Sequence, residues 1–136
     1  MVAVTLLDED LVLWRAPDGT LALTDDLCAH RGTMLSAGGV VTGDGCIRCP
    51  YHAWEYDGAG QCVRIPQVAN QALAAKVRIA SYRVVEHGAL VWTCLAAEGT
   101  ERRGIPAVPE AENSDWWLYA GEPPTWQCQA PRMVEN

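Results

Sequence analysis

The sequence has no long apolar run, few basic residues and no basic, apolar leader at its start. No apolar run approaches the roughly 20 residues of a membrane-spanning helix, which predicts a soluble chain with no membrane as partner. Ten Lys and Arg residues face seventeen Asp and Glu residues, and the formal net charge of −7 argues against nucleic acid as a partner. The missing leader predicts a cytoplasmic location, where thiols stay reduced and bind metals more often than they form disulfides.

Histidine is scarce as well, with three residues in a chain of 136 residues whose apolar composition of 49% fits one globular domain. Two histidines and two of the six cysteines fall in two short segments, Cys28-Ala29-His30 and Cys49-Pro50-Tyr51-His52. The intervening residues allow two loops to face each other across one site. One sulfur ligand and one nitrogen ligand in each loop predict a metal centre with mixed ligands.

Two metal groups fit this ligand set. A single zinc ion would take all four side chains in a tetrahedron and act as a structural clamp. A two-iron cluster would take both cysteines on one iron and both histidines on the other, and such a centre carries an electron. The spacing of the four residues does not decide between the two.

The flanking residues resemble the Rieske domains of ring-hydroxylating oxygenases, in CAHRG at residues 28–32 and CPYHAWEYDGAGQCVRIP at residues 49–66. The resemblance implies a [2Fe-2S] cluster with Cys28 and Cys49 on the inner iron and His30 and His52 on the outer iron. In that family the domain receives electrons from a ferredoxin or flavin reductase. It passes them to a mononuclear iron, in the catalytic domain or in a neighbouring subunit, that hydroxylates or demethylates an aromatic substrate. A homo-oligomer is compatible with this arrangement.

The resemblance divides the chain into a Rieske domain over residues 1–97 and, over residues 98–136, a linker and the start of a catalytic domain. The last five residues resemble the segment that precedes, in the family, the mononuclear iron ligands. No histidine lies beyond His87, so the mononuclear Fe(II) would belong to a missing domain. We therefore expect the Rieske portion of a longer oxygenase subunit. The alternatives are a stand-alone Rieske ferredoxin that carries electrons and, third, a zinc-stabilised binding module.

Two differences from respiratory-chain Rieske proteins predict a low reduction potential. The positions that carry a bracing disulfide in those proteins are Thr33 and Tyr51 here, and Trp54 stands where a serine hydroxyl donates to the cluster. Both differences lower the potential, toward the lower end of the range of about −150 to +300 mV. For Tyr56 the resemblance leaves two roles open, a hydroxyl near a ligand cysteine or an aromatic ring packed beneath the loop.

The pattern of short β-favouring segments and turn residues predicts an all-β fold, a Rieske-type antiparallel β-sandwich with both cluster loops at one end and a mostly irregular C-terminal tail. Expected strands cover residues 2–7, 11–15, 20–24, 47–48, 54–56, 61–65, 77–80, 82–85, 90–95 and 116–120. The first and last hairpin turns are expected at residues 8–10 and 86–89, and residues 70–76 are expected to be irregular. Buried, structural roles are expected for Cys46, Cys62 and Cys94, and an exposed position for Cys128.

Overall fold

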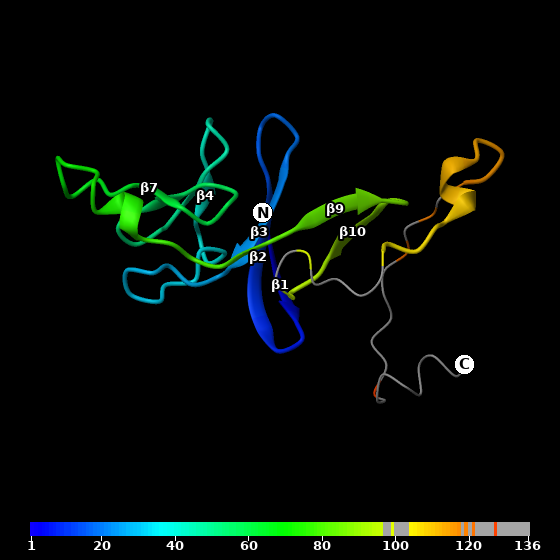
Figure 1. The fold of residues 1–136 in the computed structure, drawn as a ribbon, viewed down its shortest axis with the longest axis horizontal. Coiled ribbons are helices and arrows are strands. Elements are labelled where there is room, and N and C mark those ends of the chain that lie inside the picture. The colour runs from blue at the N-terminus through cyan, green and yellow to red at the C-terminus, as the bar shows by residue number, and fades with distance from the viewer. Residues whose placement is uncertain (97–98, 100–103, 118, 120, 122–126, 128–136) are drawn as a thin grey trace.

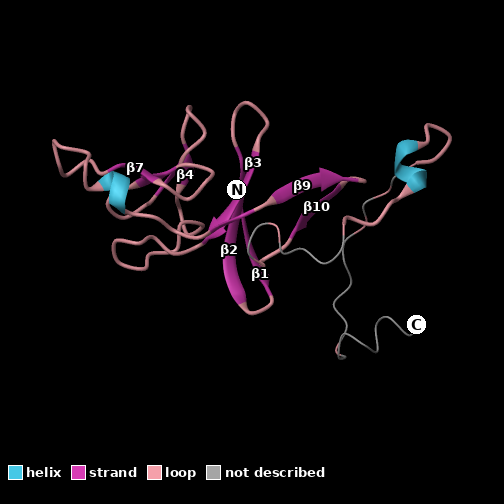
Figure 2. Ribbon diagram, in the orientation of Figure 1, coloured by secondary structure: helices cyan, strands magenta, loops and turns pink. Residues whose placement is uncertain are grey.

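The computed structural model describes residues 1–96, 99, 104–117, 119, 121 and 127. The fold is all-β apart from two short 3-10 helices, and every strand pairing is antiparallel (Figures 1 and 2). The central sheet has the order β1-β2-β3-β8. Its strands are β1 (Val2–Leu6), β2 (Glu9–Arg15), β3 (Leu21–Asp25) and β8 (Ser81–Tyr82).

A second four-stranded sheet has the order β4-β5-β6-β7. The predicted metal-binding segment at residues 28–30 lies in the connection that leads into this sheet, and the segment at residues 49–52 lies between two of its strands. Its strands are β4 (Val40–Val41), β5 (Ile47–Arg48), β6 (Glu55–Tyr56) and β7 (Cys62–Arg64). A separate hairpin pairs β9 (Val84–His87) with β10 (Leu90–Thr93). Figure 1 shows the second sheet on one side of the central strands and the β9–β10 hairpin on the other. The predicted all-β fold of antiparallel strands is confirmed.

Both outer hairpin turns are shorter than predicted. The first turn is the pair Leu7-Asp8 rather than residues 8–10, and the last is Gly88-Ala89 rather than residues 86–89. All four residues have positive φ, between 53° and 65°. Two successive left-handed residues form the turn type whose twist matches that of paired strands. Strand twist therefore sets the turn position, although three of these residues are not glycine.

Three other predicted elements differ from the structure. Residues 70–76, expected to be irregular, end in a 3-10 helix at Ala74–Lys76 (η1), because Ala74 is buried against the core. Residues 77–80 form no strand, only one bridge between Gln61 and Arg78. Residues 82–85 divide at Arg83 between β8, which pairs with β3, and β9, which pairs with β10.

The C-terminal part is irregular where it is described, apart from a 3-10 helix at Pro109–Glu112 (η2). The strand predicted over residues 116–120 falls partly outside the described residues, and Trp116 and Trp117 are not in a strand. Cys128 and residues 132–136 also lie outside the described part. No helix in the described ranges is long and apolar enough to span a bilayer.

The hydrophobic core lies between the central sheet and the second sheet. Trp14 from β2 is fully buried, and its indole N–H donates to the Gly45 carbonyl in the β4–β5 turn at 3.0 Å. Cys28, Cys49 and Tyr56 belong to the same buried cluster. The two sheets therefore share one core, and that core forms the floor of the loops that carry the predicted ligands.

Candidate metal centre

The two predicted ligand segments form loops with the same backbone design. In the first loop Gly32 N–H donates to the Cys28 carbonyl at 2.8 Å, and in the second Ala53 N–H donates to the Cys49 carbonyl at 3.1 Å. Gly32 and Ala53 occupy equivalent places and both have left-handed φ, +65° and +57°. Each cysteine thus begins a tight turn, and the histidine follows within that turn.

The two cysteines lie on the floor of the site. Cys28 is 2% exposed and Cys49 is 3% exposed, and the five cysteines in the described part of the chain are all free. Burial raises the pKa of the Cys28 thiol, a hydrogen bond from Tyr56 opposes that shift, and the neighbouring Cys49 raises the pKa further. A metal ion reverses this balance, because a coordinating thiol is deprotonated.

The two histidines lie at the rim and contact each other. The rings of His30 and His52 meet edge to face, with centroids 4.6 Å apart and planes at 71°. Both residues are half-buried. Burial lowers the pKa of His30, and the positive charges of His52 and Arg31 lower it further. The site therefore favours neutral imidazole at His30, which is the form that binds metals.

One buried nitrogen in this site has no protein partner. His52 Nδ1 is buried and makes no hydrogen bond, either as donor or as acceptor. A buried ring nitrogen without a partner is costly, and metal coordination is one way to satisfy it. The donor set of two buried thiols, two neighbouring imidazoles and this unpaired nitrogen fits a Rieske-type group. In the described part of the chain no three metal-binding side chains gather around one point. This is compatible with a two-iron cluster, because each iron of such a cluster needs only two protein ligands.

Tyr56 fills both of the roles that the sequence left open. Its ring is fully buried beneath the loops, and its hydroxyl lies 3.2 Å from Cys28 Sγ. Ala29 N–H donates to the same hydroxyl oxygen at 3.2 Å. Burial, followed by the contact with Cys28, raises the pKa of Tyr56 far above its usual range. The hydroxyl therefore keeps its proton and can donate it to a Cys28 thiolate.

A buried carboxylate closes the first loop. Asp26 is 1% exposed and accepts hydrogen bonds from the backbone N–H of Ser36 at 2.7 Å and from its hydroxyl at 2.5 Å. Gly39 ends the same loop, and a Cβ there would lie 2.2 Å from the Leu35 carbonyl. The first loop thus depends on the buried Asp26 side chain and on the absence of a Cβ at Gly39.

Gln67 is a contact of the site that the sequence did not indicate. It follows Pro66, outside both ligand segments, yet its side-chain amide joins the His52 carbonyl to the indole N–H of Trp54. Nothing in the local sequence pattern marks this residue, because the contact arises only when the segment after β7 folds back over the second loop.

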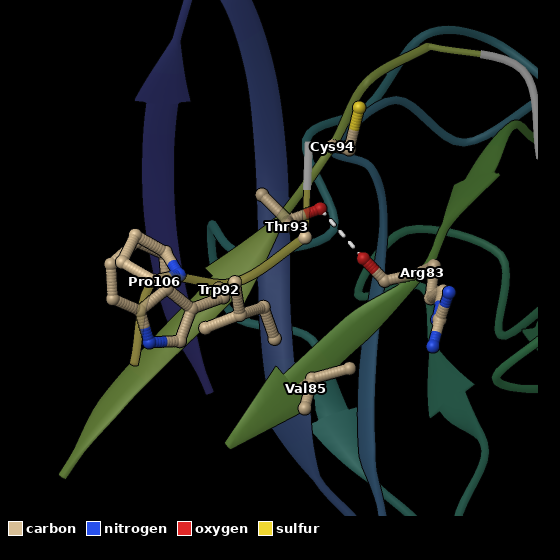
Figure 3. Close-up of a pocket in the computed structure, with 8 residues that line it drawn as sticks. Arg83, Val85, Trp92, Thr93, Cys94 and Pro106 are labelled. Carbon is tan, nitrogen blue, oxygen red and sulfur yellow. Dashed lines mark hydrogen bonds between the residues drawn. The ribbon is translucent and has the colours of Figure 1, made fainter. Parts of the chain in front are cut away.

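A cavity in the described part of the chain lies away from the four predicted ligands. It has a volume of about 470 Å³ and lies between the β9–β10 hairpin and residues 104–106. Figure 3 shows Trp92 and Pro106 at one end and Cys94 at the other, with the Thr93 hydroxyl donating to the Arg83 carbonyl at 2.8 Å. Cys46 and Cys62 are buried, as predicted, and Cys94 is half-buried. The cavity takes no side chain from the predicted metal centre.

Residues 1–83 match the family model described as "Rieske [2Fe-2S] domain". The chain belongs to the Rieske [2Fe-2S] domain family, and its cofactor is a [2Fe-2S] cluster. Zinc, the alternative that the spacing left open, is thereby set aside.

Among individual proteins, the chain is similar to oxygenases. It is 47% identical over 88 residues to the oxygenase component of dicamba O-demethylase from Stenotrophomonas maltophilia, covering 65% of this chain and 25% of that protein. It is 34% identical over 137 residues to methylxanthine N3-demethylase NdmB from Pseudomonas putida, covering 99% of this chain and 38% of that protein. The chain thus spans between a quarter and two fifths of these relatives.

Solved structures agree with the sequence matches. Dicamba monooxygenase bound to dicamba superposes with a TM-score of 0.71 at 35% identity, over 83% of this chain and 35% of that chain. NdmA from Pseudomonas putida CBB5 superposes with a TM-score of 0.73 at 33% identity, over 82% of this chain and 33% of that chain. The domain is therefore of the type found in demethylating and hydroxylating oxygenases, where its role is electron transfer, and the ferredoxin alternative is not favoured.

Proposed function

We propose that Cys28 and Cys49 bind one iron of the [2Fe-2S] cluster and that His30 and His52 bind the other. The observation that carries this assignment is the arrangement of the donors, two thiols buried in the shared core and two contacting imidazoles at the rim. The unpaired, buried His52 Nδ1 supports it, because coordination supplies the partner that the protein does not. When bound, the cluster accepts and gives up one electron at a time.

The chain's own residues have three tasks in this proposal. The buried cysteines fix the cluster in the core, the Tyr56 hydroxyl stabilises negative charge on Cys28, and the half-buried histidines bring the outer iron toward the surface. Electrons therefore enter and leave at the histidine edge. The donor that we propose is a ferredoxin or flavin reductase, and the acceptor is a mononuclear iron in an oxygenase catalytic domain or a neighbouring subunit.

The activity that we propose for the whole protein is hydroxylation or demethylation of an aromatic or related substrate, in the cytoplasm and in a homo-oligomer. The names of the relatives support it, since they include two demethylases and the oxygenase subunit of a chlorobenzoate dioxygenase. We further propose that residues 98–136 form the linker and the first part of a catalytic domain. The match to NdmB supports this, because it extends over 99% of the chain.

Metal analysis with matched variants tests the ligand assignment. The purified protein should contain about two irons and about two acid-labile sulfides per chain, with visible absorption and, after reduction, a low-temperature EPR signal. Cys28→Ser and His30→Ala should lose both signals. The matched controls Cys62→Ser and His87→Ala change residues of the same types outside the proposed ligand set and should keep them. A cluster that survives His30→Ala, or is lost in His87→Ala, would contradict the assignment.

A shortened chain tests the proposed division. Residues 1–97 alone should keep the iron content and the visible spectrum, because neither the core nor the proposed ligands extend beyond β10 in the described part. Loss of the cluster from this shorter chain would move the domain boundary beyond residue 97.

A further inference from the structure

The rim of the site holds a stacked pair of rings. The indole of Trp54 lies flat on the imidazole of His30, with centroids 4.6 Å apart and planes at 6°. The two residues come from different loops. One face of the His30 ring is therefore covered by an aromatic face, and the same ring meets His52 in a T-shaped contact.

The Gln67 side chain fixes the indole in this position. Gln67 Oε1 accepts the indole N–H of Trp54 at 3.2 Å, and Gln67 Nε2 donates to the His52 carbonyl at 2.8 Å. An indole nitrogen only donates and a carbonyl only accepts, so the orientation of the amide is determined by its two partners. Both polar ends of Gln67 are thus used within the site.

We propose that Gln67 is a positioning residue that holds Trp54 against His30 and thereby lowers the reduction potential of the centre. The inference rests on the proposed function, since it takes His30 as a ligand. Gln67 makes hydrogen bonds with the Trp54 indole and the His52 backbone and none with either histidine ring. It acts through the indole, and its effect disappears when the indole is removed.

The sign of the effect follows from charge. Reduction adds a negative charge to the centre, and the indole both excludes water from one face of His30 and presents its electron-rich face to that ring. Exclusion of water and the aromatic quadrupole each disfavour added negative charge. Both effects favour the oxidised state, so loss of the stacked indole should raise the potential. The expected change is about threefold in the equilibrium constant for reduction, or about 28 mV at 59 mV per tenfold.

The chain offers a matched control for Gln67. Gln71 lies in the same segment, and its side chain also bridges backbone groups, accepting from Ile65 N–H and donating to the carbonyls of Ile65 and Val68. None of these hydrogen bonds reaches a ring at the rim. A variant at Gln71 therefore reports what loosening this segment does without releasing the indole.

The test is a redox titration of the cluster-loaded protein, followed by visible circular dichroism and by EPR of the reduced form. The variants are Gln67→Met, Trp54→Leu, the double variant and Gln71→Met, each with its iron content measured first. Gln67→Met and Trp54→Leu should raise the potential and alter the EPR line shape. The double variant should match Trp54→Leu, and Gln71→Met should match the unaltered protein.

Three results would overturn the proposal. The first is an unchanged potential in Gln67→Met. The second is a double variant whose potential lies well above that of Trp54→Leu. The third is loss of the cluster from Gln67→Met but not from Trp54→Leu, which would show that Gln67 holds the loop rather than the indole. Failure of the ligand assignment is distinguishable, because it appears as missing iron in the unaltered protein or as a full cluster in His30→Ala.

Discussion

Replacing Tyr56 with phenylalanine removes one oxygen atom from the floor of the metal centre and leaves the buried ring in place. The lost hydroxyl lies 3.2 Å from Cys28 Sγ and accepts the Ala29 N–H at 3.2 Å. A thiolate that binds iron can only accept, so the hydroxyl is the donor in the loaded protein. The variant therefore loses a hydrogen bond that stabilises negative charge on sulfur.

The size of the effect follows from the change in that hydrogen bond between the two redox states. Hydrogen bonds to charged groups contribute about 1.5–3 kcal/mol, and the part that differs between oxidised and reduced forms is a fraction of this, about 1 kcal/mol. For a one-electron couple this corresponds to about 40 mV. The potential of Tyr56→Phe should be lower by this amount, because the reduced state loses more stabilisation than the oxidised state.

Redox titrations at several pH values give the measurement. Since burial and Cys28 raise the pKa of Tyr56 far above its usual range, the difference between the two proteins should stay constant from neutral to moderately alkaline pH. Tyr82→Phe is the control, because its hydroxyl donates to the Asp25 carboxylate at 3.0 Å rather than to sulfur. A Tyr56→Phe potential equal to or above that of the unaltered protein would refute the reasoning.

Four further outcomes are expected. The midpoint potential of the unaltered protein should lie below zero, and a redox titration with a positive midpoint would contradict the reasoning from Trp54 and the missing disulfide. Asp26→Ala should lower the free energy of unfolding by about 3 kcal/mol in urea titrations, since it leaves the Ser36 N–H without an acceptor. Ser36→Ala should lower the free energy of unfolding by less. Glu55→Gln should lower the free energy of unfolding by about 1.5 kcal/mol, since the side chains of its partners Arg48 and Arg64 are 41% and 58% exposed and stay partly hydrated; an effect above 4 kcal/mol would be inconsistent with that hydration. Gly39→Ala should cost about 1–3 kcal/mol, and unchanged stability would show that the Leu35 carbonyl can move aside.

The strands that the sequence predicted well are those with several apolar positions of their own. β2 and β3 each contain several apolar residues, and both lie close to the predicted ranges. β4 has two residues and exists because its neighbour β5 supplies hydrogen bonds, which no local pattern reports. The Leu7-Asp8 turn was missed for a related reason, since strand twist imposes left-handed conformations that neither residue prefers.

In the candidate site, too, some residues could be predicted from the local sequence and others could not. Cys28, His30, Cys49 and His52 were predicted from residue chemistry and spacing; the structure places the two cysteines side by side in the core and the two histidine rings in contact, and their role as ligands stays a prediction. Asp26 and Gln67 could not be assigned roles, because one acts from within the core on a distant serine and the other folds back from beyond β7. Metal ligands can be predicted from residue type and spacing. Supporting contacts cannot, because they depend on which distant segments the fold brings together.

The depth of the two cysteine thiols has a consequence for the order in which the protein matures. At 2% and 3% exposure, Cys28 and Cys49 are out of reach of any assembly protein that hands over a preformed cluster, whereas the histidines at the rim remain accessible. Transfer of a preformed cluster to Cys28 and Cys49 therefore requires the two loops to separate. Loading of the cluster therefore comes before the closure of the two loops or together with it.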